Sequence, residues 1–497
     1  MNYLKNLSNK YVIKLSSKMV LCLSIAYLYL PLLVFLFTWV KFWIFLCCLI
    51  VAGWLLYNIY SDFIKNDENN IEINIPIFIF IVIILLCLGI ICGLGGWFPQ
   101  SNDWTKHNAV LRDLISSPWP VYYTSANNPS MLTYNIGSYL IPAVFGKIFN
   151  SFRAGEIFLF LWLEIGLILV VVNLFFDCNA QNNTRKLGVV LVFILFNGCL
   201  LGAQQMIGIL TGVSTNDFRW VLENDKNIFQ YKSNVTCIRF ILPQIVHTWL
   251  VISIWWRKKI NKNIVGLMLP VLISGVLSFC GLVFMAVINI ITDLILNKKI
   301  ASTLKNVFSI QNIVGAGTIG IVLFIYYSGN VFEEKPHEIS FYLVKPRLIL
   351  LLCFIIFEFG LYCLIVWKEQ KRNGLFIGAF VLLMILPFVH MGKLNDLQIV
   401  GNVPAMFVVM ITLINYIIIH KKEFLTGFLV AVIAFSSFYS LKEMSEARYP
   451  SYDYRSMVIS LESWSDFNIE YNDKKFNYFT YDYKNCLFVK YFAKEVR

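Results

Sequence analysis

Long blocks of apolar residues, separated by short polar stretches, run through almost the whole of this chain. Most blocks reach about eighteen residues or more, which lets a helix cross about 30 Å of hydrocarbon. Because only helices and closed barrels satisfy their own backbone polar groups in lipid, the pattern predicts transmembrane helices. About thirteen are expected, at 19–38, 40–60, 75–96, 155–176, 187–207, 238–256, 263–279, 280–297, 308–327, 347–367, 374–390, 398–419 and 423–441.

One further apolar segment, 133–149, departs from this pattern. It is short and contains Tyr134, Gly137, Tyr139 and Pro142. Broken backbone is tolerated at membrane depth only where it is buried in protein or lines a cavity. We therefore expect this segment to be re-entrant or interfacial rather than a full span, with Lys147 and Arg153 outside the membrane or snorkelling at its edge.

The short loops between the spans carry most of the basic residues, in six clusters. They lie at the N-terminus, Arg185-Lys186, Arg257-Lys258-Lys259, Lys298-Lys299, Lys368-Glu369-Gln370-Lys371-Arg372 and Lys421-Lys422. Since Lys and Arg favour the cytosolic side of a membrane, we expect all six clusters there, with the N-terminus cytoplasmic and the C-terminus extracytoplasmic. The long polar loops, 97–132, 208–236, 328–346 and 391–397, then share the outer face, which makes that face the functional one.

The composition agrees with a multi-pass membrane protein. Of 497 residues, 58% are hydrophobic and 14% charged, and the mean hydropathy is +0.68. The net charge of +12 does not indicate nucleic-acid binding, because the basic residues cluster in short loops. The twelve cysteines lie mostly in apolar runs without a CxxC pair, so neither a disulfide framework nor a structural zinc site is predicted.

Two parts of unequal size are expected. Residues 1–441 form the transmembrane domain, whose basic N-terminus leads into two apolar runs without a clear cleavage site and so predicts a retained anchor. Residues 442–497 form a polar, aromatic tail that is too short for an independent core of much stability. We expect this tail to be a small extracytoplasmic appendage packed on the outer loops.

The first long outer loop holds the sharpest candidates for chemistry, in the stretch Asp103-Trp104-Thr105-Lys106-His107-Asn108. If 103–116 is helical, Asp103 and His107 lie at positions i and i+4 and project on one face. Lys106 borders that face, and Trp104 lies on an apolar side suited to resting on lipid or on helix ends. Such a carboxylate is either a general base, metal ligand or substrate contact, or a helix cap or interfacial anchor.

A second group of polar residues surrounds the start of span 238–256. It comprises Gln230, Tyr231, Asn234, Gln244 and His247. Amides bond to hydroxyls and aromatic faces stack on C–H surfaces, so the group suits a sugar; an ordinary solvated loop is the alternative before the span. Polar groups at membrane depth, among them Gln244, His247 and Glu358 of a later span, are costly unless they are satisfied or used.

Two other outer loops add candidates. The loop 328–346 leads into Arg347, which suits either a lipid-linked phosphate or a snorkelling anchor. Asn395-Asp396 separates two spans and is either a functional loop or an ordinary turn. Four histidines lie in or near the outer face, but no HExxH-like spacing supports a metal site; they are His107, His247, His337 and His390.

A first outer loop with an acidic residue, followed by short amphipathic segments and many spans, resembles the GT-C superfamily of membrane glycosyltransferases. In that superfamily the acidic residue acts as base or metal ligand, and the donor is a polyprenyl-phosphate-linked sugar. More narrowly, three stretches look like a group of bacterial polytopic proteins encoded with surface-polysaccharide genes: Asp103 to Leu114 with Trp119-Pro120, Gln230-Tyr231 to Pro243-Gln244, and Asn395-Asp396 to Pro404. The chain departs from that group at Val400, near which an Arg is expected.

The resemblance implies a glycosyltransferase for surface-glycan assembly or modification, acting on the outer leaflet of the bacterial inner (cytoplasmic) membrane. Asp103 and His107 would be catalytic, and Lys106, Arg112 and Arg347 would bind the donor phosphate. Substrate contacts are expected from Trp104, Asn108, Gln230, Tyr231, Asn234, Gln244, His247, Asn395 and Asp396. The implied partners are the lipid bilayer, a polyprenyl-linked sugar donor and a glycan or glycolipid acceptor, with a divalent cation as cofactor if Asp103 is a metal ligand.

Two other functions fit similar spans. A surface-polysaccharide polymerase or ligase needs outer-face arginines for pyrophosphate, and Arg112, Arg219 and Arg347 are few for that task. A lipid-linked sugar transporter or flippase, which is not an enzyme, is disfavoured because no inverted repeat is visible and few ionisable groups lie mid-membrane. Dependence of function on Glu358 rather than on Asp103 would favour the transporter.

Overall fold

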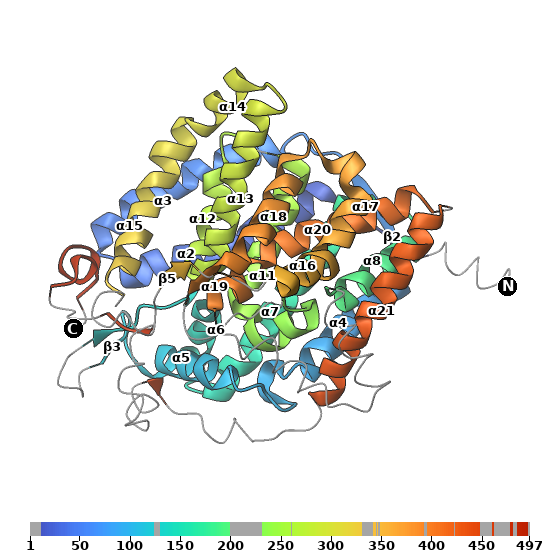
Figure 1. Cartoon of the computed structure of the whole chain (residues 1–497). Coiled ribbons are helices and arrows are strands. Elements are labelled where there is room, and N and C mark those ends of the chain that lie inside the picture. The colour runs from blue at the N-terminus through green and yellow to red at the C-terminus, as the bar shows by residue number, and fades with distance from the viewer. Residues whose placement is uncertain are drawn as a thin grey trace.

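The computed structural model describes residues 11–123, 130–198, 231–259, 261–330, 341–343, 345, 348–391, 395–421, 423–447, 460–461, 478–480 and 485–495. In these ranges helices make up nearly all of the regular structure, and the strands form three two-stranded antiparallel sheets. The expectation of an all-α chain is confirmed at this level. Figure 1 shows the long helices bundled together, with α5 lying across one end of the bundle and α14 projecting from the opposite end.

The helices and strands have the following bounds. The helices are α2 (Ser17–Trp39), α3 (Phe42–Ile59), α4 (Ile75–Ile91), α5 (Trp104–Ser116), α6 (Gly137–Ile148), α7 (Phe152–Asp177), α8 (Asn183–Leu195), α11 (Asn234–Lys258), α12 (Ile264–Ser274), α13 (Val276–Ile295), α14 (Ile300–Val307), α15 (Gly317–Ser328), α16 (Leu348–Phe354), α17 (Leu361–Gln370), α18 (Gly374–Ile385), α19 (Asp396–Gly401), α20 (Val403–Ile419) and α21 (Phe424–Glu446). The strands are β1 (Val12–Ser16), β2 (Asn70–Asn74), β3 (Tyr122–Tyr123), β4 (Ser130–Met131), β5 (Phe341–Leu343) and β6 (Val389–Met391).

Nine helical segments among the described residues are long and apolar enough to cross a membrane. They are Ser17–Trp39, Phe42–Ile64, Phe152–Asp177, Asn234–Lys258, Val276–Ile295, Ile300–Ser328, Leu351–Gln370, Asp396–Ile419 and Phe424–Glu446. Three shorter apolar segments, Ile75–Ile91, Ile264–Ser274 and Gly374–Phe388, accompany them. By length and composition the chain is a multi-pass membrane protein, whereas the total of about thirteen crossings stays a prediction because part of the chain lies outside the described ranges.

The structure corrects the boundary between two expected spans. Hydropathy places one span at 263–279 and the next at 280–297, whereas α12 ends at Ser274 and α13 begins at Val276. The break falls at Gly275, whose backbone is extended and where a Cβ would lie 2.1 Å from the carbonyl oxygen of Gln244. Because a side chain would collide with α11 at this point, close packing rather than hydropathy sets the boundary.

The short segment 133–149 contains α6. With 12 residues, this helix is about 18 Å long and cannot cross a bilayer by itself. Lys147 near its end donates to the carbonyl of Ile115 at 3.1 Å and to that of Ser117. It thereby provides hydrogen bonds to carbonyl groups at the C-terminal end of α5. Arg153 pairs with Glu156, with 3.0 Å between Nη1 and Oε2. Both basic residues are therefore engaged by protein groups.

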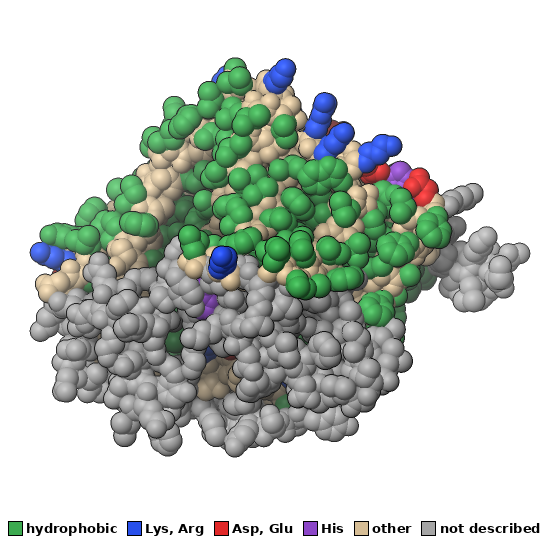
Figure 2. All heavy atoms as spheres, in the orientation of Figure 1, with side chains coloured by type: hydrophobic (Ala, Val, Ile, Leu, Met, Phe, Trp, Pro, Cys, Tyr) green, Lys and Arg blue, Asp and Glu red, His purple; other side chains and the backbone are tan. Residues whose placement is uncertain are grey.

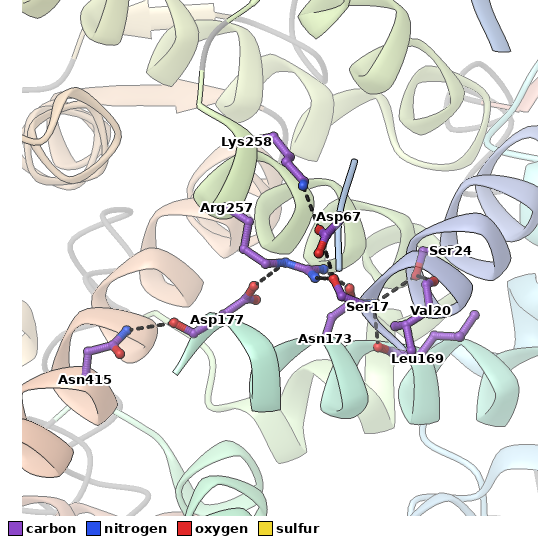
Figure 3. Close-up of polar contacts among 10 residues, drawn as sticks. All are labelled: Ser17, Val20, Ser24, Asp67, Leu169, Asn173, Asp177, Arg257, Lys258 and Asn415. Carbon is purple, nitrogen blue, oxygen red and sulfur yellow. Dashed lines mark hydrogen bonds and ion pairs between the residues drawn. The ribbon is translucent and has the colours of Figure 1, made fainter. Parts of the chain in front are cut away.

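A polar network joins the ends of several helices at one end of the bundle (Figure 3). Arg257 in the last turn of α11 pairs with Asp177 at the end of α7, with 2.8 Å between Nε and Oδ1. Lys258 pairs with Asp67, with 2.7 Å between Nζ and Oδ2. Ser17, the first residue of α2, donates to Asp67 and accepts from Arg257. The start of α2 and the basic end of α11 therefore share one face of the molecule.

Other basic loops lie on the same face. His420 contacts Glu369 at 2.5 Å, and Asn297 donates to the carbonyl of Arg372 at 3.1 Å, so the loops after α13, α17 and α20 meet. Asn415 of α20 donates to the carbonyl of the last residue of α7, which joins these loops to the network of Figure 3. Figure 2 shows Lys and Arg side chains along the upper edge of a broad band of exposed hydrophobic side chains. Which side of the membrane this face occupies stays a prediction.

Candidate functional site

Helix α5 is anchored on α11 at a proline. Pro243 has no N–H, so the carbonyl of Arg239, four residues earlier, has no helical partner. The indole Nε1 of Trp104 donates to that carbonyl at 2.9 Å, and Ser101 Oγ donates to it at 3.3 Å. Trp104 is fully buried, so this side of α5 rests on another helix rather than on lipid. Substrate contact by Trp104 stays a prediction.

The C-terminal end of α5 is also held by contacts with other segments. Ile115 packs against Gly146 of α6 and Gly155 of α7, where a Cβ would lie 2.5 and 2.4 Å from its Cδ1 atom. The buried carboxylate of Asp113 accepts from the hydroxyl of Tyr123 at 2.8 Å and from the backbone N–H of Leu461 at 2.9 Å. These contacts fix the orientation of α5 and bring the C-terminal tail to it.

Asp103 and Lys106 form an ion pair at the start of α5. Their Oδ1 and Nζ atoms are 3.1 Å apart, and the side chains are 28% and 23% exposed. Asp103 occupies the N-cap position, but its carboxylate makes no capping hydrogen bond to the backbone. The capping interpretation therefore does not describe this side chain, which instead lies half-buried beside a cation.

Neighbouring cations keep Asp103 ionised. Burial raises the pKa of its carboxyl, but the ammonium groups of Lys106 and Lys232 lower it more, so the net pKa lies below the ordinary value. Burial lowers the pKa of Lys106, whereas the tyrosines and the carboxylate around it raise it above the ordinary value. Both members of the pair are therefore charged at neutral pH.

Lys232 is a site residue that sequence reasoning missed. It is half-buried, and its Nζ lies 4.6 Å from the ring centroid of Phe240, a cation–π distance. Burial lowers its pKa while Asp103 opposes this shift, so the ammonium lies within electrostatic reach of that carboxylate. The available signal was its place next to Tyr231, in a loop already chosen for its polar residues.

His107 is fully buried and both of its ring nitrogens are engaged. Nε2 lies 3.0 Å from the carbonyl oxygen of Phe240, and Nδ1 is hydrogen-bonded to the hydroxyl of Tyr139. Because a carbonyl only accepts, Nε2 carries the proton and Nδ1 accepts from the hydroxyl. Burial and then Lys106 lower the pKa of His107 to about 4, so the ring is neutral at pH 7. Its contacts hold α5 on α11, and its catalytic role stays a prediction.

Two tyrosines complete the surroundings of the ion pair. The rings of Tyr134 and Tyr478 have centroids 4.5 Å apart and are tilted by 43°, and both act on the pKa of Lys106. Gln244, expected to bind substrate, donates from Nε2 to the Tyr134 hydroxyl at 3.0 Å and so supports this ring. Sequence reasoning missed both tyrosines, because the aromatic composition of the tail does not single out Tyr478.

The Asn395-Asp396 turn faces the same site. Asn395 has a left-handed backbone with φ +53°, and its Oδ1 accepts from the N–H of Met391 at 3.1 Å, so its side chain serves the turn. Asp396 is exposed and lies within electrostatic reach of Lys106 and Asp103. Two loops that the sequence analysis selected therefore converge.

Asn108 and Arg112 lie away from the ion pair. Asn108 is buried, and its Nδ2 donates to Oε1 of Gln100 at 2.7 Å. Arg112 is exposed and lies nine positions after Asp103, which is about two and a half helical turns and so the opposite face. The structure does not bring these two predicted contacts to the pair.

Tyr231 and Asn234 form hydrogen bonds to other helices. The N–H of Tyr231 donates to Oε1 of Glu358 at 3.1 Å, and its hydroxyl donates to the carbonyl of Leu383 at 2.8 Å. Asn234 Nδ2 donates to the carbonyl of Phe193, near the end of α8, at 2.7 Å. The buried carboxylate of Glu358 is therefore satisfied in part by a hydrogen bond from a neighbouring segment.

The remaining candidates do not extend the site. His247 is buried with its ring centroid 5.2 Å from that of Tyr27, and neither ring nitrogen has a hydrogen-bond partner among the described residues. Gln230 and Arg347 lie outside the described residues. Within the described part of the chain, no group of three or more His, Cys, Asp or Glu side chains could hold a metal ion.

The assembled site joins five separate parts of the chain: the start of α5, the segment before α6, the start of α11, the turn before α19 and the tail. No protein-family model, curated protein or solved structure matches the chain.

Proposed function

We propose that the chain is a membrane glycosyltransferase that transfers a sugar from a polyprenyl-phosphate-linked donor to a glycan or glycolipid acceptor on the outer leaflet. One observation carries the proposal: the Asp103–Lys106 ion pair is charged and half-buried, and Lys232 and Asp396 lie within its electrostatic reach. The pair lies at the end of the bundle opposite the basic loops, where the phosphate of a lipid-linked donor would meet it while the polyprenyl chain stays among apolar helices.

Sugar transfer needs an anion and cations at adjacent positions. Asp103 would accept the proton of the acceptor hydroxyl while that oxygen forms its bond to the anomeric carbon. The bond from this carbon to the phosphate oxygen breaks, and its electron pair goes to the phosphate. Lys106 and Lys232 would stabilise the negative charge that develops there.

We also propose how the chain is oriented in the membrane. The chain would cross it about thirteen times, with the basic loops in the cytosol and the α5 end outside. The tail would lie on the outer side, which is supported by the bridge between Val40, at the end of α2, and Ala493. The partners are then the bilayer, the lipid-linked donor and the acceptor.

The substitution Asp103→Asn tests the proposal. Membranes containing the protein would be supplied with radiolabelled polyprenyl-phosphate-linked hexoses and N-acetylhexosamines, and with bacterial surface glycans as acceptors. We expect transfer by the wild type and a rate lower by about a hundredfold or more in the variant, the size of a general-base contribution. Wild-type activity in Asp103→Asn would overturn the assignment.

Asp62→Asn is the matched control. Asp62 also forms a half-buried pair with a lysine, Lys262, at 3.3 Å, but it lies at the basic end of the bundle. Transfer should be unchanged in this variant. A second measurement follows binding of polyprenyl phosphate, the expected product, which Lys106→Gln and Lys232→Gln should each weaken by about tenfold.

A further inference from the structure

Backbone pairing holds part of the C-terminal tail against the site. The N–H of Thr133 donates to the carbonyl of Tyr478 at 2.7 Å, and the N–H of Thr480 donates to the carbonyl of Met131 at 2.8 Å. The hydroxyl oxygen of Thr480 accepts from the N–H of Met131 at 2.8 Å. Three consecutive tail residues are thereby held in one register beside β4.

This register sends neighbouring side chains in different directions, as in any extended segment. Phe479 is buried and packs edge-on against Tyr123, with ring centroids 4.9 Å apart. Tyr478 is half-buried instead and lies within electrostatic reach of Lys106 and Asp103. Phe479 and the backbone bonds dock the tail independently of the Tyr478 ring, which packs on Tyr134.

The Tyr478 side chain belongs to a hydrogen-bonded series. Gln244 donates to the Tyr134 hydroxyl, and the Tyr134 side chain in turn hydrogen-bonds Tyr478. Two half-buried phenol rings thus lie within electrostatic reach of Lys106, and an amide bonds to one of them. Aromatic faces stack on the C–H surfaces of sugars, and phenol and amide groups bond to their hydroxyls.

We propose that Tyr478, together with Tyr134, binds a pyranose ring beside the Asp103–Lys106 pair, so that the C-terminal tail completes the substrate site. The inference rests on the proposed function, because a sugar is the ligand that the site would take. The pyranose belongs either to the donor or to the acceptor, and both present the same chemistry to the two rings.

The test compares Tyr478→Phe and Tyr478→Ala with Tyr491→Phe, a control at an exposed tail tyrosine. Loss of the hydroxyl alone should raise the KM for one substrate about fivefold, and loss of the ring as well should raise it by tenfold or more. The substrate whose KM rises identifies the pyranose as that of donor or acceptor. Binding of polyprenyl phosphate, which carries no sugar, should be unchanged in all three variants.

Two outcomes overturn the inference while the proposed function stands. One is a wild-type KM for both substrates in Tyr478→Phe. The other is a raised KM accompanied by rapid release of the tail under limited proteolysis, since the residue would then act through docking.

A different outcome separates the two proposals. If the wild type neither transfers sugar nor binds polyprenyl phosphate, the proposed function fails. Tyr478 is then tested by direct binding to an array of immobilised bacterial surface oligosaccharides. Binding by the wild type that is lost in Tyr478→Ala supports the inference, and equal binding or none overturns it.

Discussion

Ion pairs occur at both ends of the helix bundle, and the pairs differ in exposure. At the basic end, the side chains of Asp177 and Asp67 are 0% and 2% exposed, and both pair with cations at the end of α11. At the other end, the side chain of Asp103 is 28% exposed. Buried pairs cannot lose a partner without leaving an uncompensated charge, whereas half-buried pairs contribute little to stability. Burial therefore distinguishes the Asp177 and Asp67 pairs, which hold helix ends together, from the Asp103 pair, which stays partly exposed.

The largest effect is expected at the buried end. Arg257→Met leaves Asp177 without its cation and should lower the free energy of unfolding by about 3–5 kcal/mol. Chemical unfolding in a defined detergent measures the loss. Adding Asp177→Asn to this variant should restore part of the stability, because the orphaned charge is removed. If Arg257→Met alone were as stable as the wild type, the contrast between the buried and the half-buried ion pairs would fail.

The next effect depends on pH and concerns His107. Its pKa falls from 6.5 to about 4 in the folded protein, so between these values the unfolded chain binds a proton that the folded chain does not. The contribution of the neutral ring to the free energy of unfolding is complete above pH 6.5 and is lost as the pH falls towards 4. At about 1.4 kcal/mol per pKa unit, the loss is about 3 kcal/mol. Unfolding of the wild type and His107→Gln should therefore diverge in pH dependence over this range. Parallel curves would show that burial does not hold this ring neutral.

A smaller effect is expected where α5 docks. Trp104→Phe replaces the indole with a smaller aromatic ring and removes the N–H that reaches the carbonyl of Arg239. Loss of this hydrogen bond alone should cost about 1–2 kcal/mol of unfolding free energy. In a Pro243→Ala background the same change should cost less, because a backbone N–H at position 243 can then serve that carbonyl. Equal costs in the two backgrounds would contradict the docking geometry.

The smallest effect on stability is expected at the site. Asp103→Asn should change the free energy of unfolding by less than about 1 kcal/mol, because the pair is half-buried. The same variant should lose transfer activity. A stability loss as large as that of Arg257→Met would make Asp103 a structural residue like Asp177 and would remove the contrast between the two ends.

The parts of this fold that follow from local composition could be predicted. Apolar run length located most of the helices, and loop charge identified basic loops that meet on one face. The short segment around α6 was recognised from Pro142 and its length. The break at Gly275 was missed, because it depends on the backbone of Gln244 in another helix.

The site depended on contacts that no local pattern contains. Trp104 and Arg239 are 135 residues apart in the chain, and the partners of His107 lie 32 and 133 residues away. Helical spacing correctly placed His107 near Asp103, but it could not show that one residue is buried while the other is half-buried. Tyr478 is held at the site by backbone pairing of the tail with residues near position 132, which hydropathy does not report.

The position of Pro243 along α11 helps to determine where the site lies on that helix. A regular helix uses its carbonyls in its own hydrogen bonds, and the proline releases one of them at a defined point on the α11 surface. Moving the proline by one residue would rotate the released carbonyl by about 100° around the helix axis. The indole of Trp104 could not follow without carrying α5 and its ion pair to another side of α11. Pro243, which is remote in sequence from Asp103, therefore helps to determine where on α11 the Asp103 carboxylate lies.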